Sequence, residues 1–350
     1  MRRTAHIRRP GGLRIPTALA VAVMSAALCG CGGAGGEPYT GELFAMDTFM
    51  RLSAYGQAAE DAVRAASDEI ARLDAMWSVT DADSEIYALN SFGSAAVSPE
   101  TLEIIAYAAS VSGETGGALD ITVYPAVRAW GFTTDEYRVP GEGELREIAP
   151  LVNYRAVKTD GNTTALAPGA AVDFGALAKG YASQRAAEIF REHGVESGIV
   201  SLGGNVQTVG RKPDGSPWNV AIQDPEDSGR YAGTLKTQDA AVVTSGVYQR
   251  YFESGGKLYH HIIDPSTLRP ADSGLLSATV VAENGALADA LSTALFVLGR
   301  ESAETYWRNS GRDFDMILIT ETGEVVITEG IADAYTHENT DRTLAVLAVP

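Results

Sequence analysis

Apolar residues recur at helical spacing in four segments of the chain. In the first segment, apolar residues three or four apart from Val63 to Leu73 predict an amphipathic helix over residues 58–76. A serine–proline start or a glycine stop marks three further segments of this kind, at residues 98–113, 178–193 and 286–298. Gly194 and Gly299 follow the last two segments, and we expect each glycine to end its helix in the left-handed conformation.

Short β-rich runs occupy much of the remaining chain. They lie at residues 198–202, 218–223, 240–244, 258–263, 278–282, 316–320 and 344–349. Helical and strand segments alternate irregularly, which favours an α+β fold with mixed, mainly antiparallel sheets and packed helices over a doubly wound parallel sheet. Residues 41–350 contain no second glycine-rich linker, no repeat of fixed period and no long charge block, so we expect one unit.

The amino end has the features of an export signal. Five arginines precede an apolar run at residues 16–28 that is too short to span a bilayer comfortably. The run ends at Leu28-Cys29-Gly30-Cys31, which resembles the bacterial lipoprotein box. We expect residues 1–30 to be a lipoprotein signal peptide, Cys31 to carry the lipid, and residues 31–40 to form a glycine-rich tether. The protein would then be lipid-anchored at the cell membrane on its extracytoplasmic side; a plain secretory signal and an uncleaved anchor are the alternatives.

Charge and cysteine content narrow the possible functions. The chain has 45 acidic and 27 basic residues, and the first thirty residues contain five arginines and no acid, so the remainder carries 22 − 45 = −23. A surface this acidic repels phosphates, and we expect no nucleic-acid partner. Two cysteines, Cys29 and Cys31, cannot build a disulfide framework or a thiolate metal site. Motifs of nicotinamide dehydrogenases, P-loop enzymes, zincins and esterases are missing.

One carboxylate stands out in the strongly apolar segment of residues 286–299. Asp289 and Thr293 are four residues apart, so on a helix both oxygens emerge from the same face. Burying a carboxylate is costly unless it is paired or binds a cation, and two hard oxygen donors suit Mg2+. In the alternative interpretation, Asp289 faces solvent and Thr293 bonds back to the carbonyl of Asp289.

Residues 172–181 form a second candidate segment, which passes from a strand end through glycine and small residues into a helix. Exposed amides at the start of a helix, with Lys179 beside them, suit an anionic group. Asp173 could accept hydrogen bonds from a base or a ribose. The ordinary alternative is a capped loop-to-helix junction with a surface lysine.

Adjacent histidines, His260 and His261, lie on a predicted strand that leads into a proline turn. One of them must face inward, either as a core histidine or as a proton carrier, and the other must face outward. Two glycine-bearing pieces, residues 201–205 and 244–248, would either let the backbone approach a ligand closely or simply form bends. Residues 117–125 and the following Trp130 fit a ligand wall or ordinary core packing.

Seven ordered blocks resemble the ApbE-type FAD:protein FMN transferases, and they cover nearly all of the chain after the signal. The blocks are Met46-Asp47-Thr48-Phe49-Met50, Ala118-Leu119-Asp120 running on to Trp130-Gly131-Phe132, Asp173-Phe174-Gly175-Ala176 to Gly180-Tyr181, Gly203-Gly204-Asn205, Thr244-Ser245-Gly246-Val247-Tyr248, His261-Ile262-Ile263-Asp264-Pro265 and Ala288-Asp289-Ala290-Leu291-Ser292-Thr293. Family members are commonly lipoproteins. The resemblance implies a two-lobed, ApbE-like single unit, with a flavin transferase domain over residues 41–350.

The resemblance implies a Mg2+-dependent enzyme that binds FAD and transfers its FMN half to a threonine or serine hydroxyl of an extracytoplasmic acceptor flavoprotein, releasing AMP. It assigns the metal ligands to Asp289, Thr293 and the backbone oxygen of Ala176. It assigns the flavin and adenosine contacts to Met46, Thr80, Ala118, Leu119, Asp120, Asp173, Lys179, His261, Ile262 and Ile263. His261 is our candidate base for the acceptor hydroxyl, and the metal-side carboxylate of Asp289 competes for that role.

The sequence departs from the family pattern at two positions. Thr80 lies where many members have an aromatic residue over the flavin, and Trp77 is three residues away, so either side chain could lie there. Leu268 stands where the family usually has glycine in the proline turn. Two other functions stay open: hydrolysis of FAD to FMN and AMP, and non-catalytic capture of a flavin or another solute by a lipoprotein.

Overall fold

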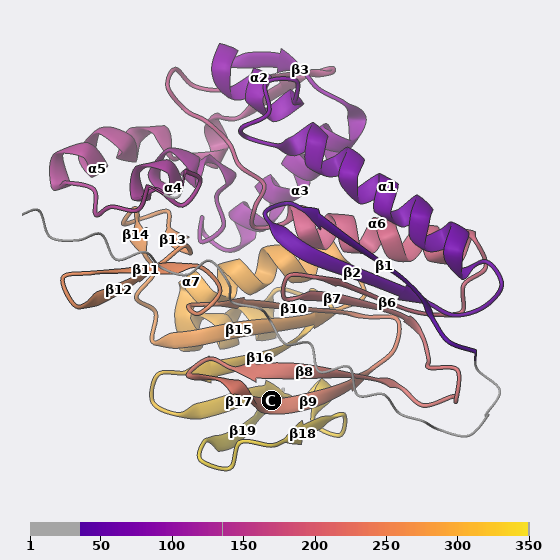
Figure 1. Cartoon of the computed structure of the whole chain (residues 1–350). Coiled ribbons are helices and arrows are strands. Elements are labelled where there is room, and N and C mark those ends of the chain that lie inside the picture. Colours follow the sequence, from indigo (N-terminus) through magenta and orange to yellow (C-terminus); the bar gives the residue numbers. More distant parts are fainter. Residues whose placement is uncertain (1–35, 135, 349–350) are drawn as a thin grey trace, which may run out of the picture. The chain divides into compact units, whose positions relative to one another are not determined.

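The computed structural model describes residues 36–134 and 136–348, and these residues form one compact unit. The helices are α1 Ala59–Trp77, α2 Glu85–Phe92, α3 Pro99–Glu114, α4 Tyr124–Trp130, α5 Glu142–Ile148, α6 Ala178–Glu192 and α7 Gly285–Asn309, with 3-10 turns η1 Ile121–Val123, η2 Ala149–Leu151, η3 Tyr154–Ala156 and η4 Glu329–Ile331. Figure 1 shows their arrangement.

The main sheet has nine strands in the order β1-β2-β6-β7-β10-β15-β16-β17-β19. These strands are β1 Tyr39–Ala45, β2 Thr48–Ala54, β6 Ser197–Leu202, β7 Asn205–Gly210, β10 Ala241–Gly246, β15 Leu275–Ala282, β16 Asp315–Thr320, β17 Glu324–Thr328 and β19 Thr343–Leu347. Every neighbouring pair is antiparallel except β17 and β19, which are parallel. The predicted α+β fold with mainly antiparallel sheets is therefore confirmed.

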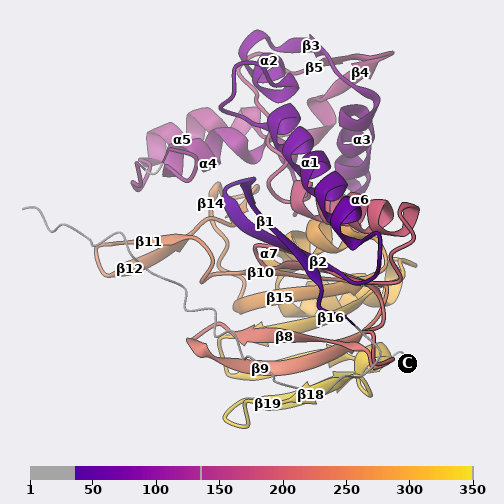
Figure 2. The ribbon, with the colours of Figure 1, turned by 45° about the vertical axis from the view of Figure 1, so that its right-hand side comes forward.

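Smaller sheets surround the main one. They comprise β8 Trp218–Asp224 and β9 Asp227–Thr237 with β18 Tyr335–His337, β3 Ser94–Ala96 with β5 Thr163–Ala165 and β4 Lys158–Asp160, β11 Tyr251–Ser254 with β12 Lys257–His260, and β13 Ile263–Asp264 with β14 Arg269–Pro270. Figures 1 and 2 place α1, α6 and α7 on one side of the main sheet and β8, β9 and β18 on the other.

Both faces of the main sheet are buried, and β16 shows how the sequence achieves this. Met316 and Leu318 pack into the core shared with the helices, whereas Ile317 and Ile319 pack into a second core with β8 and β9. Successive side chains of a strand point to opposite faces, so a run that is apolar at every position suits a strand covered on both sides.

All four predicted helices are present, as α1, α3, α6 and α7, and their starts and the ends of the first three lie within about two residues of the expected positions. Gly194 has the positive φ expected after α6. The expectation that the last helix ends at Gly299 is wrong. Gly299 does interrupt the helix, with φ 74° and ψ 171°, but a further helical segment follows it to Asn309. The sequence reading stopped at the glycine because a positive φ commonly ends a helix.

The predicted strand at residues 258–263 is also wrong in its extent. The chain pairs with β11 as far as His260 and then pairs with β14 from Ile263. Between these strands, the His261 N–H donates to the Arg250 carbonyl, and the Ile262 carbonyl accepts from Ala271. The chain changes partners at this point, and no periodicity within the segment reveals such a change.

The predicted signal peptide, the lipidated Cys31 and most of the tether lie outside the described residues. Within residues 36–134 and 136–348, no helix combines the length and apolarity needed to cross a bilayer.

Candidate active site

The close crossing of α6 and α7 positions the central carboxylate. A Cβ atom at Gly180 would overlap the Gly285 carbonyl, and a Cβ at Gly285 would in turn approach the Gly180 carbonyl. Two glycines at the contact therefore let the helix backbones approach each other. At this distance the Gly180 N–H donates to Asp289 Oδ2 at 2.8 Å, although the two residues are 109 positions apart.

Asp289 is buried, with 4% of its surface exposed. Its charge partner is Lys179, whose Nζ lies 3.8 Å from Asp289 Oδ2. The alternative in which Asp289 faces solvent is therefore wrong. The hydroxyl that bonds back to the Asp289 carbonyl belongs to Ser292, at 2.9 Å. Thr293 instead lies 3.2 Å from the hydroxyl of Ser245, at the end of β10.

The hydrogen bond to Asp289 also changes the start of α6. In a regular helix the Gly180 N–H would donate to the carbonyl of Ala176, four residues earlier. Here that N–H is engaged by Asp289, so the Ala176 carbonyl lacks its usual donor. A carboxylate, a freed carbonyl and a hydroxyl are hard oxygen ligands of the kind Mg2+ prefers. The residues assigned as metal ligands therefore fit a divalent cation.

The described residues contain no metal site built mainly from carboxylates or histidines. Within the described part of the chain, no group of three or more His, Cys, Asp or Glu side chains could hold a metal ion. The Asp289 set differs from such a group because it combines one carboxylate with neutral oxygens. Mg2+ commonly takes one or two carboxylates and completes its octahedron with water and phosphate.

Asp173 lies in the loop before α6, and Lys179 lies in the first turn of α6. Together they border one side of the site. Asp173 Oδ1 accepts from the Gly175 N–H at 2.6 Å, and Lys179 Nζ donates to the Gly175 carbonyl at 3.1 Å. Burial raises the pKa of Asp173; the Gly175 N–H and the cations Lys179 and Arg250 oppose this rise, and Asp47 adds to it. Acidic and basic groups from three segments, residues 172–181, Arg250 and Asp47, thus act on one another here.

His260 takes the inward position expected on the strand, whereas His261 follows the end of β12. His260 is buried, with Nε2 3.0 Å from the Ala271 carbonyl and its ring edge against Phe296, and it is the core histidine. His261 is half-buried, and its Nδ1 lies 3.2 Å from the Arg250 carbonyl. Burial, together with the cations Arg250 and Lys179, lowers the pKa of His261 to about 3. Its imidazole is therefore neutral at pH 7 and able to accept a proton.

Arg250 is a site residue that the sequence reading missed. Its guanidinium donates to the Phe132 carbonyl at 2.6 Å and lies 3.8 Å from Asp47 Oδ2. The signal was available in Gly255-Gly256, because a two-glycine turn predicts a hairpin. Ser254 pairs with Lys257, and the same register continued outward places Arg250 opposite His261.

The β1–β2 hairpin borders the same cluster. Its turn residues Met46 and Asp47 both have positive φ, 48° and 58°, as a two-residue hairpin turn requires. The Met46 N–H donates to Asp74 Oδ1 at 3.0 Å, and Asp47 reaches Arg250. Met46 thus lies beside the charged cluster, and its contact with flavin or adenosine stays a prediction.

Several residues assigned to flavin or adenosine contacts are not drawn into the charged cluster. Asp120 is buried and accepts hydrogen bonds from Thr122 and from the Tyr154 N–H. Leu119, Ile262 and Ile263 are buried apolar side chains, and Ala118 is half-buried. These residues shape the loops around the site, so any ligand contact from the buried apolar group would come from backbone atoms.

Trp77 and Thr80 were the two candidates for the position over the flavin, and the structure describes both side chains. Its indole is buried, packs edge-on against Phe174 and Tyr181, and donates from Nε1 to Thr101 Oγ1 at 2.9 Å. The indole is therefore part of the core. Thr80 is exposed on the loop after α1 and offers no ring.

The structure also shows the backbone conformation at Gly203 and Gly204 and at Leu268, which stands where the family usually has glycine. Gly203 and Gly204 both have positive φ and form the two-residue turn between β6 and β7, so the bend interpretation is right for them. Leu268 adopts φ 59°, the conformation that a glycine would take there. It is held by its N–H bond to the Asp264 carbonyl, by the Trp130 indole on its own carbonyl, and by burial beside α4.

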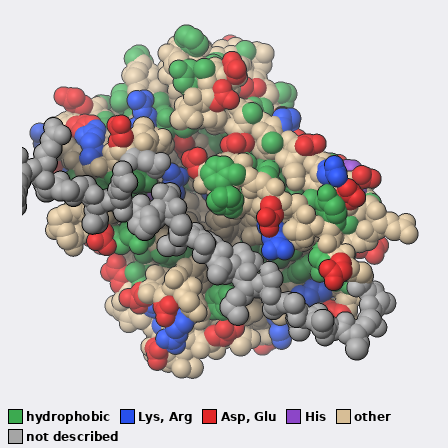
Figure 3. Space-filling model, in the orientation of Figure 1, with side chains coloured by type: hydrophobic (Ala, Val, Ile, Leu, Met, Phe, Trp, Pro, Cys, Tyr) green, Lys and Arg blue, Asp and Glu red, His purple; other side chains and the backbone are tan. Residues whose placement is uncertain are grey.

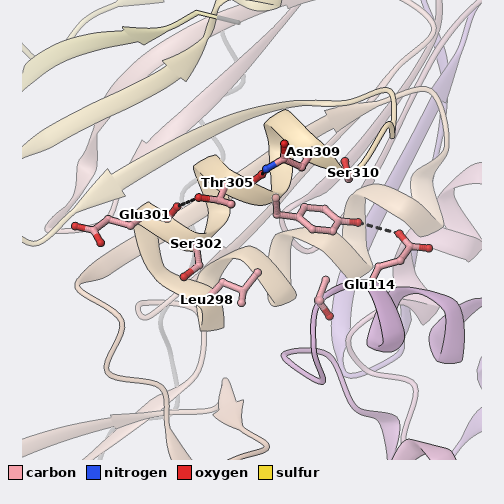
Figure 4. Close-up of a pocket in the computed structure, with 9 residues that line it drawn as sticks. Glu114, Leu298, Glu301, Ser302, Thr305, Asn309 and Ser310 are labelled. Carbon is pink, nitrogen blue, oxygen red and sulfur yellow. Dashed lines mark hydrogen bonds between the residues drawn. The ribbon is translucent and has the colours of Figure 1, made fainter. Parts of the chain in front are cut away.

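A separate pocket of about 700 Å³ lies between the end of α3 and the second half of α7 (Figure 4). It is lined by Glu114, Thr115, Leu298, Glu301, Ser302, Thr305, Tyr306, Asn309 and Ser310. Tyr306 and Arg312 hydrogen-bond Glu114, so the carboxylate at its edge is already paired. This pocket shares no residue with the cluster around Asp289, and we do not assign it as the active site.

Comparison with known proteins gives one consistent result. The ApbE family pattern matches residues 46–318. An FAD:protein FMN transferase of Vibrio cholerae is 36% identical over 226 residues, covering 63% of this chain and 68% of the relative. The FAD:protein FMN transferase of Treponema pallidum is 31% identical over 311 residues, covering 81% of this chain and 86% of the relative.

Solved structures agree with the sequence relatives. An ApbE protein from Thermotoga maritima superposes with a TM-score of 0.80 at 32% identity, covering 85% of this chain and 99% of that one. The flavinyl transferase ApbE from Pseudomonas stutzeri, in its apo form, superposes with a TM-score of 0.76 at 26% identity, covering 86% of this chain and 97% of that one. The matched region contains Asp173, Lys179, His261 and Asp289, and the chain belongs to the ApbE family.

Proposed function

We propose that this protein is an FAD:protein FMN transferase that requires Mg2+. It binds FAD, moves the FMN half onto a threonine or serine hydroxyl of an extracytoplasmic acceptor flavoprotein, and releases AMP. The observation that carries the proposal is the buried Asp289, which accepts the Gly180 N–H and thereby leaves the Ala176 carbonyl without its usual donor, with Thr293 one turn further along α7. The names of the relatives support the flavin chemistry.

Asp289, Thr293 and the Ala176 carbonyl would hold the metal. When bound there, Mg2+ neutralises negative charge on the diphosphate of FAD and on the leaving phosphate. Lys179, half-buried beside Asp289, adds a fixed positive charge at the same place. The amides at the start of α6 favour an anion as well, since the helix N-terminus carries partial positive charge.

His261 is suited to receive the proton of the acceptor hydroxyl. A proton on Nδ1 would be held by the Arg250 carbonyl, which leaves Nε2 as the accepting nitrogen. The lowered pKa of His261 keeps the ring neutral but makes it a weak base in the free enzyme. An anionic substrate beside it would raise that pKa, because a nearby negative charge favours the imidazolium.

The proposal is tested by weighing an acceptor. The full-length chain, purified in detergent, is incubated with FAD, Mg2+ and an acceptor domain that carries a threonine or serine flavinylation motif. We expect the acceptor to gain the mass of one FMN, and we expect this gain to vanish with a chelator, with Asp289→Ala, or with the acceptor hydroxyl removed. Formation of AMP and free FMN without labelling would indicate hydrolysis, and tight FAD binding without turnover would indicate a carrier.

We also propose that Cys31 carries a lipid that anchors the protein to the cell membrane on its extracytoplasmic side. The support is the sequence around Cys31 and the Gly32-Gly33-Ala34-Gly35-Gly36 run that follows it. Metabolic labelling with a fatty acid should tag the wild-type chain and leave Cys31→Ser unlabelled. Labelling that persists in Cys31→Ser would contradict the proposal.

A further inference from the structure

Two aromatic side chains stand exposed at the tip of the β1–β2 hairpin. Phe44 is 62% exposed and Phe49 is 83% exposed. They are direct cross-strand partners, and their rings meet edge to face with centroids 5.1 Å apart. Single exposed apolar residues are ordinary on protein surfaces, but a paired aromatic patch at one point calls for an explanation.

The hairpin core does not explain the patch. Along β2, Met50 and Leu52 point inward and are buried, whereas Phe49 and Arg51 point outward. Opposite them on β1, Glu42 faces Arg51 and Phe44 faces Phe49. The outward face of the hairpin is thus polar at one pair and aromatic at the next, where alternation alone would place polar residues. Exposing both rings gains nothing for folding.

The patch is continuous with the candidate active site. Phe44 and Phe49 flank the turn in which Asp47 reaches Arg250, and the Arg250 carbonyl holds His261. Figure 3, in the orientation of Figure 1, shows a hydrophobic cluster where the hairpin tip lies, with the surface recessed beside it. The hairpin tip therefore borders the site through its turn residues.

The charge around the patch favours a basic partner. Asp74 lies under the turn, and its pKa is raised by burial and by the neighbouring carboxylates Asp47 and Asp81, although the Met46 N–H opposes the rise. Asp47 and Glu42 already face Arg250 and Arg51, so the excess negative charge beside the turn comes from Asp74 and Asp81. Such an excess favours a polypeptide surface that carries lysine or arginine over an anionic lipid. Exposed aromatic side chains are frequent anchors at the centre of protein interfaces.

We propose that the Phe44–Phe49 pair is the docking surface for the acceptor polypeptide. An apolar side chain of the acceptor packs on the two rings, and basic residues beside it face Asp81. The contact holds the hydroxyl-bearing segment at the site during transfer. This inference rests on the proposed FMN transfer, because that reaction is what requires a protein substrate.

The test compares Phe44→Ser/Phe49→Ser with wild type in the full chain, using the purified acceptor domain described above. We expect the KM for the acceptor to rise about 10- to 30-fold, as for loss of an interface anchor. We expect FAD affinity and the rate of acceptor-independent FAD hydrolysis to change less than about twofold. Rising salt should increase the wild-type KM for the acceptor, because screening weakens the charge attraction.

Phe92→Ser is the matched control. Phe92 is 81% exposed and ends α2, which Figures 1 and 2 show away from the hairpin tip. This variant should leave the KM for the acceptor unchanged. A comparable rise in Phe92→Ser would overturn the assignment to the hairpin, because it would indicate a general effect of removing surface rings.

Other outcomes separate this inference from the proposed function. If wild type labels the acceptor and the double variant does so with the same KM, the docking surface is wrong and the transferase function stands. If FAD affinity falls together with acceptor affinity, the rings belong to the flavin pocket and the docking assignment is wrong. If the variant instead loses vesicle binding or dimer formation with an unchanged acceptor KM, the occupant is lipid or a second copy. If wild type labels no acceptor, both proposals fail.

Discussion

Two buried aspartates in this protein, Asp224 and Asp289, are satisfied to different degrees. Asp224 is 2% exposed and accepts hydrogen bonds from Arg342 on both oxygens, from Asn339 and from the Glu226 N–H. Asp289 is 4% exposed and accepts one backbone N–H, with a lysine 3.8 Å away. The first carboxylate ties the start of the β8–β9 turn to the segment before β19.

The difference indicates which carboxylate is structural and which is functional. Burial acts to raise the pKa of Asp224, but the hydrogen bonds from Arg342, Glu226 and Asn339 lower it to about 2. All of its acceptor capacity is used within the fold. Asp289 keeps lone pairs that no described donor occupies, and these are what a metal ion requires. Burial alone would not have distinguished the two residues.

The sharpest way to break this comparison is to neutralise each carboxylate. Asp289→Asn should reduce the rate of FMN transfer about 10³-fold, a loss typical of removing one group that stabilises developing charge, while the folded protein remains. Asp224→Asn should leave the rate per folded molecule near wild type. The measurements are initial rates by acceptor mass and folded fraction by circular dichroism. Equal kinetic losses in both variants would contradict the division of roles.

Removing the partner of the structural carboxylate tests its stability role. Arg342→Leu leaves Asp224 buried and unpaired, and we expect the free energy of unfolding to fall by about 3 kcal/mol or more. The matched control is Arg64→Leu, because Arg64 pairs with Glu60 at the surface. That change should cost at most about 1 kcal/mol. Urea unfolding measures both values, and similar losses would show that burial of the pair adds nothing.

Measuring the free energy of unfolding as a function of pH tests the stabilising role of Asp224 in a second way. Because the pKa of Asp224 in the folded protein is about 2, below the ordinary 3.8, its stabilising effect is complete above about pH 5. That effect, about 2 kcal/mol, is lost as the pH falls toward 2. Unfolding free energies of wild type should therefore fall more steeply between pH 5 and 2 than those of Asp224→Asn. Parallel curves would contradict the lowered pKa.

The helix crossing that fixes Asp289 can be tested at its glycine. Gly180→Ala places a Cβ against the Gly285 carbonyl and the Asp289 Cβ. We expect the α6–α7 crossing to widen, with a loss of about 1–3 kcal/mol in stability and weaker Mg2+ dependence of transfer. Gly143→Ala is the control, since a Cβ there meets no backbone atom within 4 Å. Calorimetry and Mg2+ titration of the rate give the two readouts.

The smallest effect concerns His261. Burial and the cations Arg250 and Lys179 lower its pKa to about 3, so the free enzyme should show no imidazole inflection in kcat/KM between pH 5 and 8. His261→Asn should lower the rate across this whole range without changing the shape of the profile. An inflection near pH 6.5 in wild type that disappears in His261→Asn would show that the imidazole titrates normally.

The sequence predicted local structure well where the signal is local. Four of the seven described helices, seven of the nineteen described strands and the antiparallel bias follow from periodicity and from capping residues such as Ser98 and Gly194. The Asp289–Thr293 spacing also indicated the helix face that we propose binds the metal, which stays a prediction. The break at His261 and the continuation of α7 beyond Gly299 were not predicted, because each depends on a partner that is distant in the sequence.

The roles of Arg250 and Trp77 could not be predicted from the sequence. Arg250 became a site residue through the register of one hairpin, and Trp77 was removed from consideration by packing against Phe174 and Tyr181. Neither outcome can be read from the type of residue. Arginine and tryptophan both occur on surfaces, in cores and in active sites.

The sequence by itself determined the family, the fold class, and the residues that carry oxygen and nitrogen donors. Only the tertiary structure decided that the Gly180 N–H turns to Asp289 and that the Ala176 carbonyl is thereby freed. The physical reason is distance. Residues 176–180 and 289 meet because two glycines let α6 and α7 approach closely, and contact between helices separated by about a hundred residues is set by the packing of the whole core.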